Sequence, residues 1–292
     1  MMKNFKYYLL IVLMGVGLQL VAQSDSETIK KSFKLTDTTQ ETWFCVCNIE
    51  GDVEVEAYDG NTIEVEVFKK ISARRADDVA EGMKDINVEF TQGEGFVRAI
   101  LSSPQNEYRE KDDPLACGWN WRGNNDRVYY RHRLDFKVKV PRGISVKIST
   151  VNNGDLFIKG SQGEIYANNV NGDVELVDIA HNTKAHTVNG TIEVTYTKVP
   201  EEFADFETIN GNIEVSAPKD AGAVYNFETQ YGEVYSDLDF SKRLSPKMEK
   251  NQGKRGGTLY KMSNTNSYQV GEGGPLISFK TMNGDIRVRK GK

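Results

Sequence analysis

The 292-residue sequence has few of the residues that build metal centres or cross-link small domains, with only three cysteines and three histidines. Proline is also scarce, at seven residues, whereas glycine is abundant, at 26. This combination is typical of many strands joined by tight turns. Hydrophobic residues make up 38% of the chain. Such a thin apolar interior is typical of an elongated repeat fold, in which each unit buries a narrow strip against its neighbours.

The usual signatures of catalysis are missing. His132, His181 and His186 do not form a metal-ligand motif such as H-E-x-x-H, and we interpret them as surface residues. The sequence contains neither a Gly-x-Ser-x-Gly nucleophile elbow nor a Walker-type glycine loop. We therefore predict that the protein is not an enzyme and that it has no catalytic residues, no cofactor and no metal.

The charge balance argues against nucleic acid as a partner. The formal net charge is −5 at pH 7. Phosphate contacts need clustered lysine and arginine, which a mildly acidic chain with mixed charges does not supply. We therefore expect no nucleic-acid binding.

Residues 1–22 have the pattern of a secretory signal peptide. Lys3 and Lys6 give the positive start, residues 7–21 are almost wholly apolar, and Ala22 offers a small residue at a cleavage site. The alternative is a membrane anchor, for which the apolar run is somewhat short. No later apolar stretch is long enough to span a bilayer. We expect an extracytoplasmic protein in the periplasm, at the cell surface or secreted, without a transmembrane anchor after cleavage.

One motif recurs along the chain: a polar residue, glycine, usually an acid or amide, and then two apolar residues separated by one position. Its glycine is Gly51 in the first copy. In the later copies the glycines form the predicted structural turns at Gly154, Gly163, Gly172, Gly190, Gly211, Gly232 and Gly284. From Gly154 to Gly232 the spacings are 9, 9, 18, 21 and 21 residues. A fixed period of this kind predicts stacked repeats, so we expect an all-β fold, a single-stranded β-helix or solenoid with N-G turns and one short helix.

Residues just before these glycines also repeat. Asparagine precedes glycine at Asn153, Asn171, Asn189, Asn210 and Asn283, and threonine lies three positions ahead at Thr187, Thr208, Thr229 and Thr281. Stacked copies would form amide ladders, and glycine would satisfy a positive φ. The alternative is an antiparallel β-sandwich, because Asn-Gly is also the strongest short hairpin signal. The sustained period favours the solenoid.

The remaining chain suggests boundaries. We expect a linker over 23–40 and a β-solenoid repeat domain over 41–292, with loop insertions at 102–127 and 241–257. Residues 72–85 are predicted to form a helix that Ser72 can cap, because apolar residues recur there with helical spacing.

Three cysteines and a group of aromatic residues are the candidate functional features. Cys45 and Cys47 lie two apart on a predicted strand and so share a face, and Cys117 can form a disulfide with either. A redox or metal half-site is the less favoured interpretation of Cys-x-Cys. Trp119, Trp121, Tyr129 and Tyr130 could contact a partner or, as we favour, help to cap an open solenoid end.

Repeated acids raise two further hypotheses. Asp155 and Asp173 follow glycines as in calcium-binding β-rolls, but the second glycine pair of that motif is missing. Glu175, Glu193 and Glu214 occupy equivalent outward positions, where paired carboxylates could serve a carbohydrate-active enzyme. We favour neither.

Several stretches resemble a known bacterial family. They are the repeated V/I-N-G-D/N-I/V-x-V/L motif over 151–215, the run F-K-V-K-V-P-R-G-I-S-V-K-I-S-T over 136–150, and G-G-P-L-I-S-F-K-T-M-N-G-D-I over 273–286. The sequence resembles the β-strand-repeat family called "putative adhesin". The resemblance implies an extracytoplasmic single-stranded β-helix of unknown function, without established catalytic residues.

Together these features predict a non-catalytic exported protein of the cell envelope or surface, an adhesin-like binding or scaffold module. Its partner is unknown; a glycan, an envelope protein or a peptide would fit. The alternatives are an envelope-stress signalling module and a carbohydrate-active enzyme on a β-helix. Because one fold hosts many functions, the sequence does not choose a ligand.

Overall fold

The computed structural model describes residues 23–39, 41–104, 106–108, 115–117, 119–121, 127–218, 222–244, 248–252, 258–262 and 266–291. The predicted signal peptide at 1–22 lies outside these residues. Within them, no helix has the length and apolar character of a membrane span.

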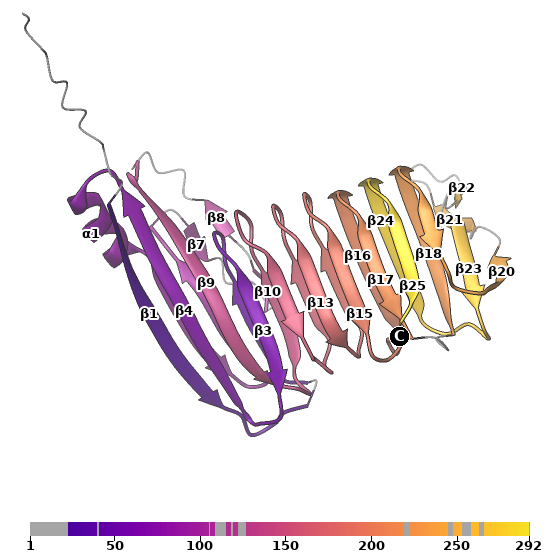
Figure 1. Cartoon of the computed structure of the whole chain (residues 1–292), viewed down its shortest axis with the longest axis horizontal. Coiled ribbons are helices and arrows are strands. Elements are labelled where there is room, and N and C mark those ends of the chain that lie inside the picture. Colours follow the sequence, from indigo (N-terminus) through magenta and orange to yellow (C-terminus); the bar gives the residue numbers. More distant parts are fainter. Residues whose placement is uncertain are drawn as a thin grey trace, which may run out of the picture.

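Two large sheets run along an elongated molecule and enclose the core between them (Figure 1). Sheet A has ten strands, in the order β1 (Gln23–Lys34), β4 (Thr62–Ala73), β9 (Tyr130–Pro141), β3 (Val53–Tyr58), β11 (Leu156–Lys159), β13 (Val174–Ile179), β15 (Ile192–Tyr196), β17 (Ile213–Ala217), β25 (Ile286–Lys290) and β19 (Val234–Ser236). Sheet B has eleven, in the order β20 (Phe240–Leu244), β23 (Asn266–Val270), β18 (Ala223–Tyr231), β24 (Leu276–Asn283), β16 (Phe203–Asn210), β14 (Thr183–His186), β12 (Ile165–Asn168), β10 (Ser145–Ser149), β2 (Trp43–Cys47), β6 (Phe96–Ser102) and β5 (Asn87–Gly93).

The repeat region is a stack of rungs, each made of one strand of sheet B followed by one strand of sheet A. Neighbouring rungs are parallel and in register: Val174 of β13 lies between Leu156 of β11 and Ile192 of β15. Sheet B repeats the pattern across β10, β12, β14 and β16. Equivalent apolar residues therefore stack in a shared interior. The predicted solenoid is confirmed, and the antiparallel sandwich alternative does not describe these rungs.

The stacking order of the last rungs differs from their order along the chain. β24 lies between β16 and β18 in sheet B, and β25 lies between β17 and β19 in sheet A. The final rung in sequence is thus the penultimate rung in space. Two antiparallel strands, β23 and β20, then extend sheet B beyond β18.

The N-terminal end of sheet A is antiparallel. β1 pairs along its full length with β4, and β4 pairs with β9. The predicted linker over 23–40 is therefore wrong for 23–34. The sequence of this segment lacks the alternation of apolar and polar residues that indicates a strand, because nearly every β1 side chain is exposed.

One helix lies among the described residues: α1 (Ala76–Asp85), which packs against β1, β4 and β9. It starts later than predicted, because β4 continues through Ala73 and takes up Ser72; Arg75 occupies the N-cap without a side-chain cap. The buried ammonium of Lys69 links these elements, donating to Glu27 Oε1 at 2.7 Å and to the Met83 carbonyl at 2.8 Å.

A column of glycines marks the turn from each sheet B strand into sheet A. In stacking order it contains Gly51, Gly154, Gly172, Gly190, Gly211, Gly284 and Gly232. A Cβ on Gly190 would lie 2.1 Å from the Gly172 carbonyl oxygen, and one on Gly211 would lie 1.9 Å from that of Gly190. Close approach of successive backbones therefore requires glycine. The predicted reason, a positive φ, is wrong for most of the column; Gly51, at 116°, is the clear exception.

Gly163 belongs to the opposite turn of its rung. A Cβ there would lie 2.1 Å from the carbonyl oxygen of Ile144, one rung away. The half-step of nine residues in the sequence therefore reflects the two turns of one rung.

Asparagine amides form a ladder beside the glycine column. Asn171 Nδ2 donates to Asn152 Oδ1 at 2.9 Å, and Asn189, Asn210 and Asn283 continue the chain of hydrogen bonds at 2.7 Å each. The predicted first member, Asn153, is wrong, because this residue adopts a left-handed φ of 51° in the turn and Asn152 takes its place.

Threonine hydroxyls satisfy the glycine carbonyls. Thr187, Thr208 and Thr281 donate to the carbonyl oxygens of Gly172, Gly190 and Gly211 at 2.9 to 3.0 Å. Backbone groups at the turns, which lie outside the regular sheet, thereby find partners.

The two predicted loop insertions contain strands. Within 102–127, β7 (Asn106–Tyr108) pairs with β8 (Trp119–Trp121). The region 241–257 contains most of β20 and all of β21 (Met248–Gln252), which pairs with β22 (Thr258–Met262).

Candidate functional site

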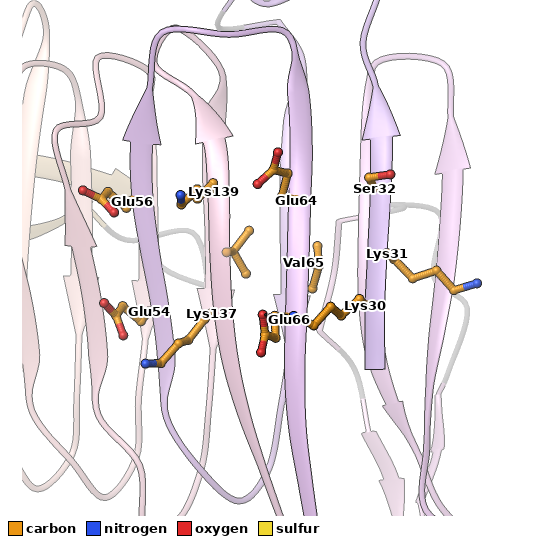
Figure 2. Close-up of a pocket in the computed structure, with 11 residues that line it drawn as sticks. Lys30, Lys31, Ser32, Glu54, Glu56, Glu64, Val65, Glu66, Lys137 and Lys139 are labelled. Atoms are coloured by element: carbon orange, nitrogen blue, oxygen red, sulfur yellow. Dashed lines mark ion pairs between the residues drawn. The ribbon is translucent and has the colours of Figure 1, made fainter. Parts of the chain in front are cut away.

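The outer face of sheet A carries a shallow charged dish of about 530 Å³ over β1, β4, β9 and β3, shown in Figure 2. Val65 and Val138 border it but are buried on the core side, so the sheet itself forms the floor. The outward side chains come from alternating strand positions: Lys30, Ser32, Glu54, Glu56, Glu64, Glu66, Lys137 and Lys139.

Opposite charges alternate across this dish. The strand register places Lys137 between Glu54 and Glu66, and Lys30 lies beyond Glu66 with its Nζ 2.9 Å from that carboxylate. Such cross-strand pairs neutralise one another. The dish therefore presents a self-compensated surface, which leaves little charge to attract a ligand.

Farther along the same face, like charges stack. Glu175, Glu193 and Glu214 are aligned on β13, β15 and β17, and Arg287 of β25 follows, 3.0 Å from Glu214. Burial, followed by the charges of Glu214 and Glu175, raises the pKa of Glu193 above its ordinary value. We call these three glutamates the acidic stripe.

The acids that follow the glycines have a structural role. The Asp155 carboxylate accepts the Asp173 backbone N–H at 2.8 Å, and the Asp173 carboxylate accepts the Thr191 N–H at 2.7 Å. Each of these acids thus links its turn to the next rung, which explains their recurrence at this position without a bound cation.

An aromatic row crosses the outer face of sheet B, formed by Trp43, Tyr166, Lys184 and Phe203 of β2, β12, β14 and β16. All four side chains are half-buried. The rings of Trp43 and Tyr166 have centroids 5.3 Å apart, with Trp43 reaching across β10. Half-buried rings on a flat sheet face can stack on the apolar face of a sugar or on an apolar side chain of a partner.

Lysine connects the rings of this aromatic row. The Lys184 ammonium lies 4.9 Å from the ring centroid of Tyr166 and 5.0 Å from that of Phe203. Such cation–π contacts hold the rings in a fixed arrangement. Burial, followed by the Glu164 carboxylate, raises the pKa of Tyr166 to about 12. The phenol therefore remains a neutral hydrogen-bond donor at physiological pH.

A disulfide anchors the 102–127 insertion beside the aromatic row. Trp43, Cys45 and Cys47 alternate along β2 and so share its outer face. Cys47 is bonded to Cys117, with Cα atoms 5.5 Å apart. Cys45 and Cys47 are nonetheless fully buried, and Leu115 packs against them. The insertion therefore covers this part of sheet B.

The model of the Toastrack DUF4097 family matches residues 135–289, more than half of the chain. The chain belongs to this family. Membership agrees with the resemblance drawn from the sequence motifs. Among curated proteins, none is significantly similar to the chain.

Solved structures to which the chain is similar come from bacteria. A "putative cell adhesion protein" from Clostridium sporogenes has 10% identity and a TM-score of 0.44, with 91% of this chain and 100% of that chain covered. A "putative adhesin" from Bacteroides fragilis has 8% identity and a TM-score of 0.36, with 90% and 97% covered. A "putative lipid binding protein" from Parabacteroides distasonis has 11% identity and a TM-score of 0.24, with 91% and 97% covered.

The Toastrack match and the aromatic row overlap only in part. Tyr166, Lys184 and Phe203 lie inside the matched segment, whereas Trp43 and Cys47 precede it. The row therefore joins a Toastrack rung surface to the N-terminal part of this chain.

The predicted aromatic group is not a single surface. Tyr129 is 69% exposed, but Tyr130 begins β9, is buried and donates to Asp85 at 2.9 Å; its prediction as a partner contact is wrong. Trp119 and Trp121 form β8, and their side chains lie outside the described residues.

Sequence reasoning missed the aromatic row. Its signal was an aromatic residue at a position that faces outward in a repeat, as at Tyr166 between buried Ile165 and Ala167. Lys184 follows Tyr166 by one 18-residue period, which places the two side by side.

Proposed function

We propose that this Toastrack protein is exported and acts without catalysis at the cell envelope or surface, as an adhesin-like binding or scaffold module. The aromatic row is its contact surface, and a glycan, an envelope protein or a peptide is its partner. The observation that carries the proposal is the continuous Trp43–Tyr166–Lys184–Phe203 contact on the outer face of sheet B.

The geometry favours binding over reaction. Successive rungs of the stack are about 4.8 Å apart. A partner that lies along the molecule would therefore make many weak, regularly spaced contacts. Hydrogen bonds of the asparagine ladder and of the threonine hydroxyls fix the turns at the ends of these strands. A preordered surface loses little entropy when a partner binds.

The test is retention on isolated cell walls and on outer-membrane vesicles of a Bacteroides species, measured with purified mature protein. The double variant Trp43→Ala/Tyr166→Ala is expected to reduce retention at least about tenfold, since stacked aromatics are typical hot spots. Cell fractionation of the full chain should place it outside the cytoplasm.

Phe68→Ala is the matched control, because Phe68 is an aromatic residue, 43% exposed, and lies in sheet A rather than in the aromatic row. It should leave retention unchanged. Equal retention of the wild-type protein and the double variant, with both folded, would refute the aromatic row as the contact surface.

A second candidate function, a carbohydrate-active enzyme, rests on the acidic stripe. A carboxyl whose pKa is raised, as at Glu193, beside acids of equivalent position is the arrangement that glycosidases use. Polysaccharide cleavage that Glu193→Gln abolishes would support this candidate. Absence of cleavage by the wild-type protein on cell-wall glycans would remove it.

A further inference from the structure

Three sulfur atoms lie together where the 102–127 insertion is anchored. The sulfurs of Cys45, Cys47 and Cys117 are all within 4.8 Å of one another, although the disulfide joins only Cys47 and Cys117. Sγ of Cys45 lies 3.8 Å from Sγ of Cys47, close to van der Waals contact. The sulfur of Cys45 therefore lies next to the Cys47–Cys117 disulfide.

Cations flank Cys45 on both neighbouring strands. The register places Arg98 of β6 on one side of Cys45 and Lys147 of β10 on the other. A nearby cation stabilises a thiolate, which is the form that attacks a disulfide. The strand register therefore puts a basic residue on each strand next to Cys45.

Packing buries two of the three sulfurs, and the Cys45 thiol also donates to the Leu115 carbonyl oxygen at 3.6 Å. Cys45 and Cys47 are fully buried, and Ile100 and Leu115 lie against them. Buried sulfurs are poorly accessible to external thiols, so a neighbour within the protein is the reaction partner that the packing permits.

We propose that Cys45 exchanges with the disulfide, so that Cys117 bonds alternately to Cys47 and to Cys45. The Cys117 side chain first turns so that its Sγ lies between those of Cys45 and Cys47. The Cys45 thiolate then attacks Sγ of Cys117 from the side opposite Cys47, and a new S–S bond forms. The Cys47–Cys117 bond breaks, and its electron pair leaves on Cys47, which takes up the proton that Cys45 lost. One disulfide and one thiol exist before and after, so the step needs no oxidant or reductant.

A bond between Cys45 and Cys47 is the disfavoured product. Residues two apart on a strand have Cα atoms about 6.6 Å apart, near the upper end of the range of about 4.4 to 6.8 Å that disulfides span. The Cα atoms of Cys47 and Cys117 are 5.5 Å apart. Both isomers therefore keep Cys117 attached to β2.

The exchange would move the anchor of the insertion along β2 by two residues, about 6.6 Å. The movement is directed toward Trp43, the first residue of the aromatic row, which lies two positions before Cys45. The disulfide isomer would therefore set how closely residues 115–117 border that row.

Disulfide mapping tests the exchange. Native protein is kept at pH 8, quenched in acid, denatured in excess N-ethylmaleimide, digested and analysed by mass spectrometry. The expected result is a Cys45–Cys117 peptide and an alkylated Cys47, in a minor population of at least about 1%. The Cys47→Ser variant should form the Cys45–Cys117 bond and melt near the temperature of Cys45→Ser.

Two controls separate native exchange from scrambling. Mixing ¹⁴N- and ¹⁵N-labelled protein before the quench would reveal scrambling between molecules as disulfides of mixed isotope. Cys45→Ser, which lacks the third thiol, must give only the Cys47–Cys117 peptide. Alkylation confined to Cys45 in the wild-type protein overturns the proposal, even if Cys47→Ser forms the alternative bond.

Discussion

On the outer face of sheet A, charged side chains alternate with buried ones along the strands of two regions. Neighbouring charges attract one another in the first region and repel one another in the second. Over β1, β4, β9 and β3, lysine faces glutamate across each strand pair, as for Lys137 between Glu54 and Glu66. Over β13, β15 and β17, glutamate stacks on glutamate. The strands of both regions share one continuous sheet.

The difference follows from how the strands were assembled. Parallel in-register rungs built from one repeated motif place each residue beside its own copy, so a charge at one position meets the same charge. Strands of unrelated sequence have no such constraint, so opposite charges can meet. Repeated Asn, Thr and Gly are compatible with stacking, because the copies of Asn hydrogen-bond one another and each Thr bonds the carbonyl of a stacked Gly. Repeated Glu is unfavourable, because like charges become neighbours.

The largest expected effect breaks the glycine column. Gly190→Ala should destabilise the protein by about 3 kcal/mol, because its Cβ would meet the Gly172 carbonyl oxygen at 2.1 Å in rigid backbone. Urea denaturation measures the change. Gly60→Ala, in the antiparallel region, should cost less than Gly190→Ala, since the atoms nearest its Cβ belong to the Tyr58 side chain and not to backbone. Equal losses would show that close approach is not what selects glycine.

The buried lysine should dominate the antiparallel region. Lys69→Met removes hydrogen bonds to Glu27 and to the Met83 carbonyl, and should destabilise the protein by about 1.5 kcal/mol. Lys30→Met, which breaks the exposed pair with Glu66, should cost no more than about 0.5 kcal/mol. Thermal and urea unfolding compare the two variants. A larger loss for Lys30→Met would reverse our ranking of these contacts.

An interior break in the asparagine ladder should have a moderate effect. Asn210→Ala removes the amide bonds to Asn189 and Asn283, both 2.7 Å, and should cost about 1 kcal/mol. Asn168→Ala is the control, because this half-buried asparagine lies in β12, outside the ladder, with ordinary strand backbone. Equilibrium urea unfolding distinguishes them, and a neutral Asn210→Ala would mean that the ladder is incidental to stability.

The smallest expected effect differs in sign between the two charged regions. Glu193→Gln should stabilise the protein by about 0.3 kcal/mol at pH 7, because it removes like-charge contacts in the acidic stripe, whereas Glu54→Gln should destabilise it by a similar amount. The raised pKa of Glu193 means that the folded state holds this proton more tightly. The contribution of Glu193 to the free energy of unfolding therefore falls as pH rises from its ordinary pKa of 4.5 through the folded value, and the Glu193→Gln gain disappears below that window. Matching signs for both variants would contradict the comparison.

The repeat geometry could be predicted because every rung repeats the same requirement. Gly190, Asn189 and Thr187 together predict one turn, and the recurrence of the same three residue types predicts that the turns are stacked. The order of the last rungs could not be predicted, because Val234 and Ile286 carry equivalent motifs and either could follow Ile213. Rungs that are interchangeable in sequence give no local signal of their order.

The candidate site was harder to predict for related reasons. Cys45 and Cys47 share one face, so spacing alone could not say which of them bonds Cys117. Trp43 and Tyr166 lie far apart in the sequence and meet only because β2 and β12 flank β10. Tyr130 was misplaced because its neighbour Tyr129 is exposed, and the burial of Tyr130 depends on contacts with α1.

The displaced position of β24 and β25 has a consequence for synthesis. A chain made from its N-terminus completes residues 223–236 well before residues 276–290, yet β18 and β19 join the stack through β24 and β25. This segment therefore reaches its place in the stack only after residues 276–290 have emerged. A polypeptide that stopped before Leu276 would lack the rung formed by β24 and β25. The rung formed by β18 and β19 would then also lack the strands on which it stacks.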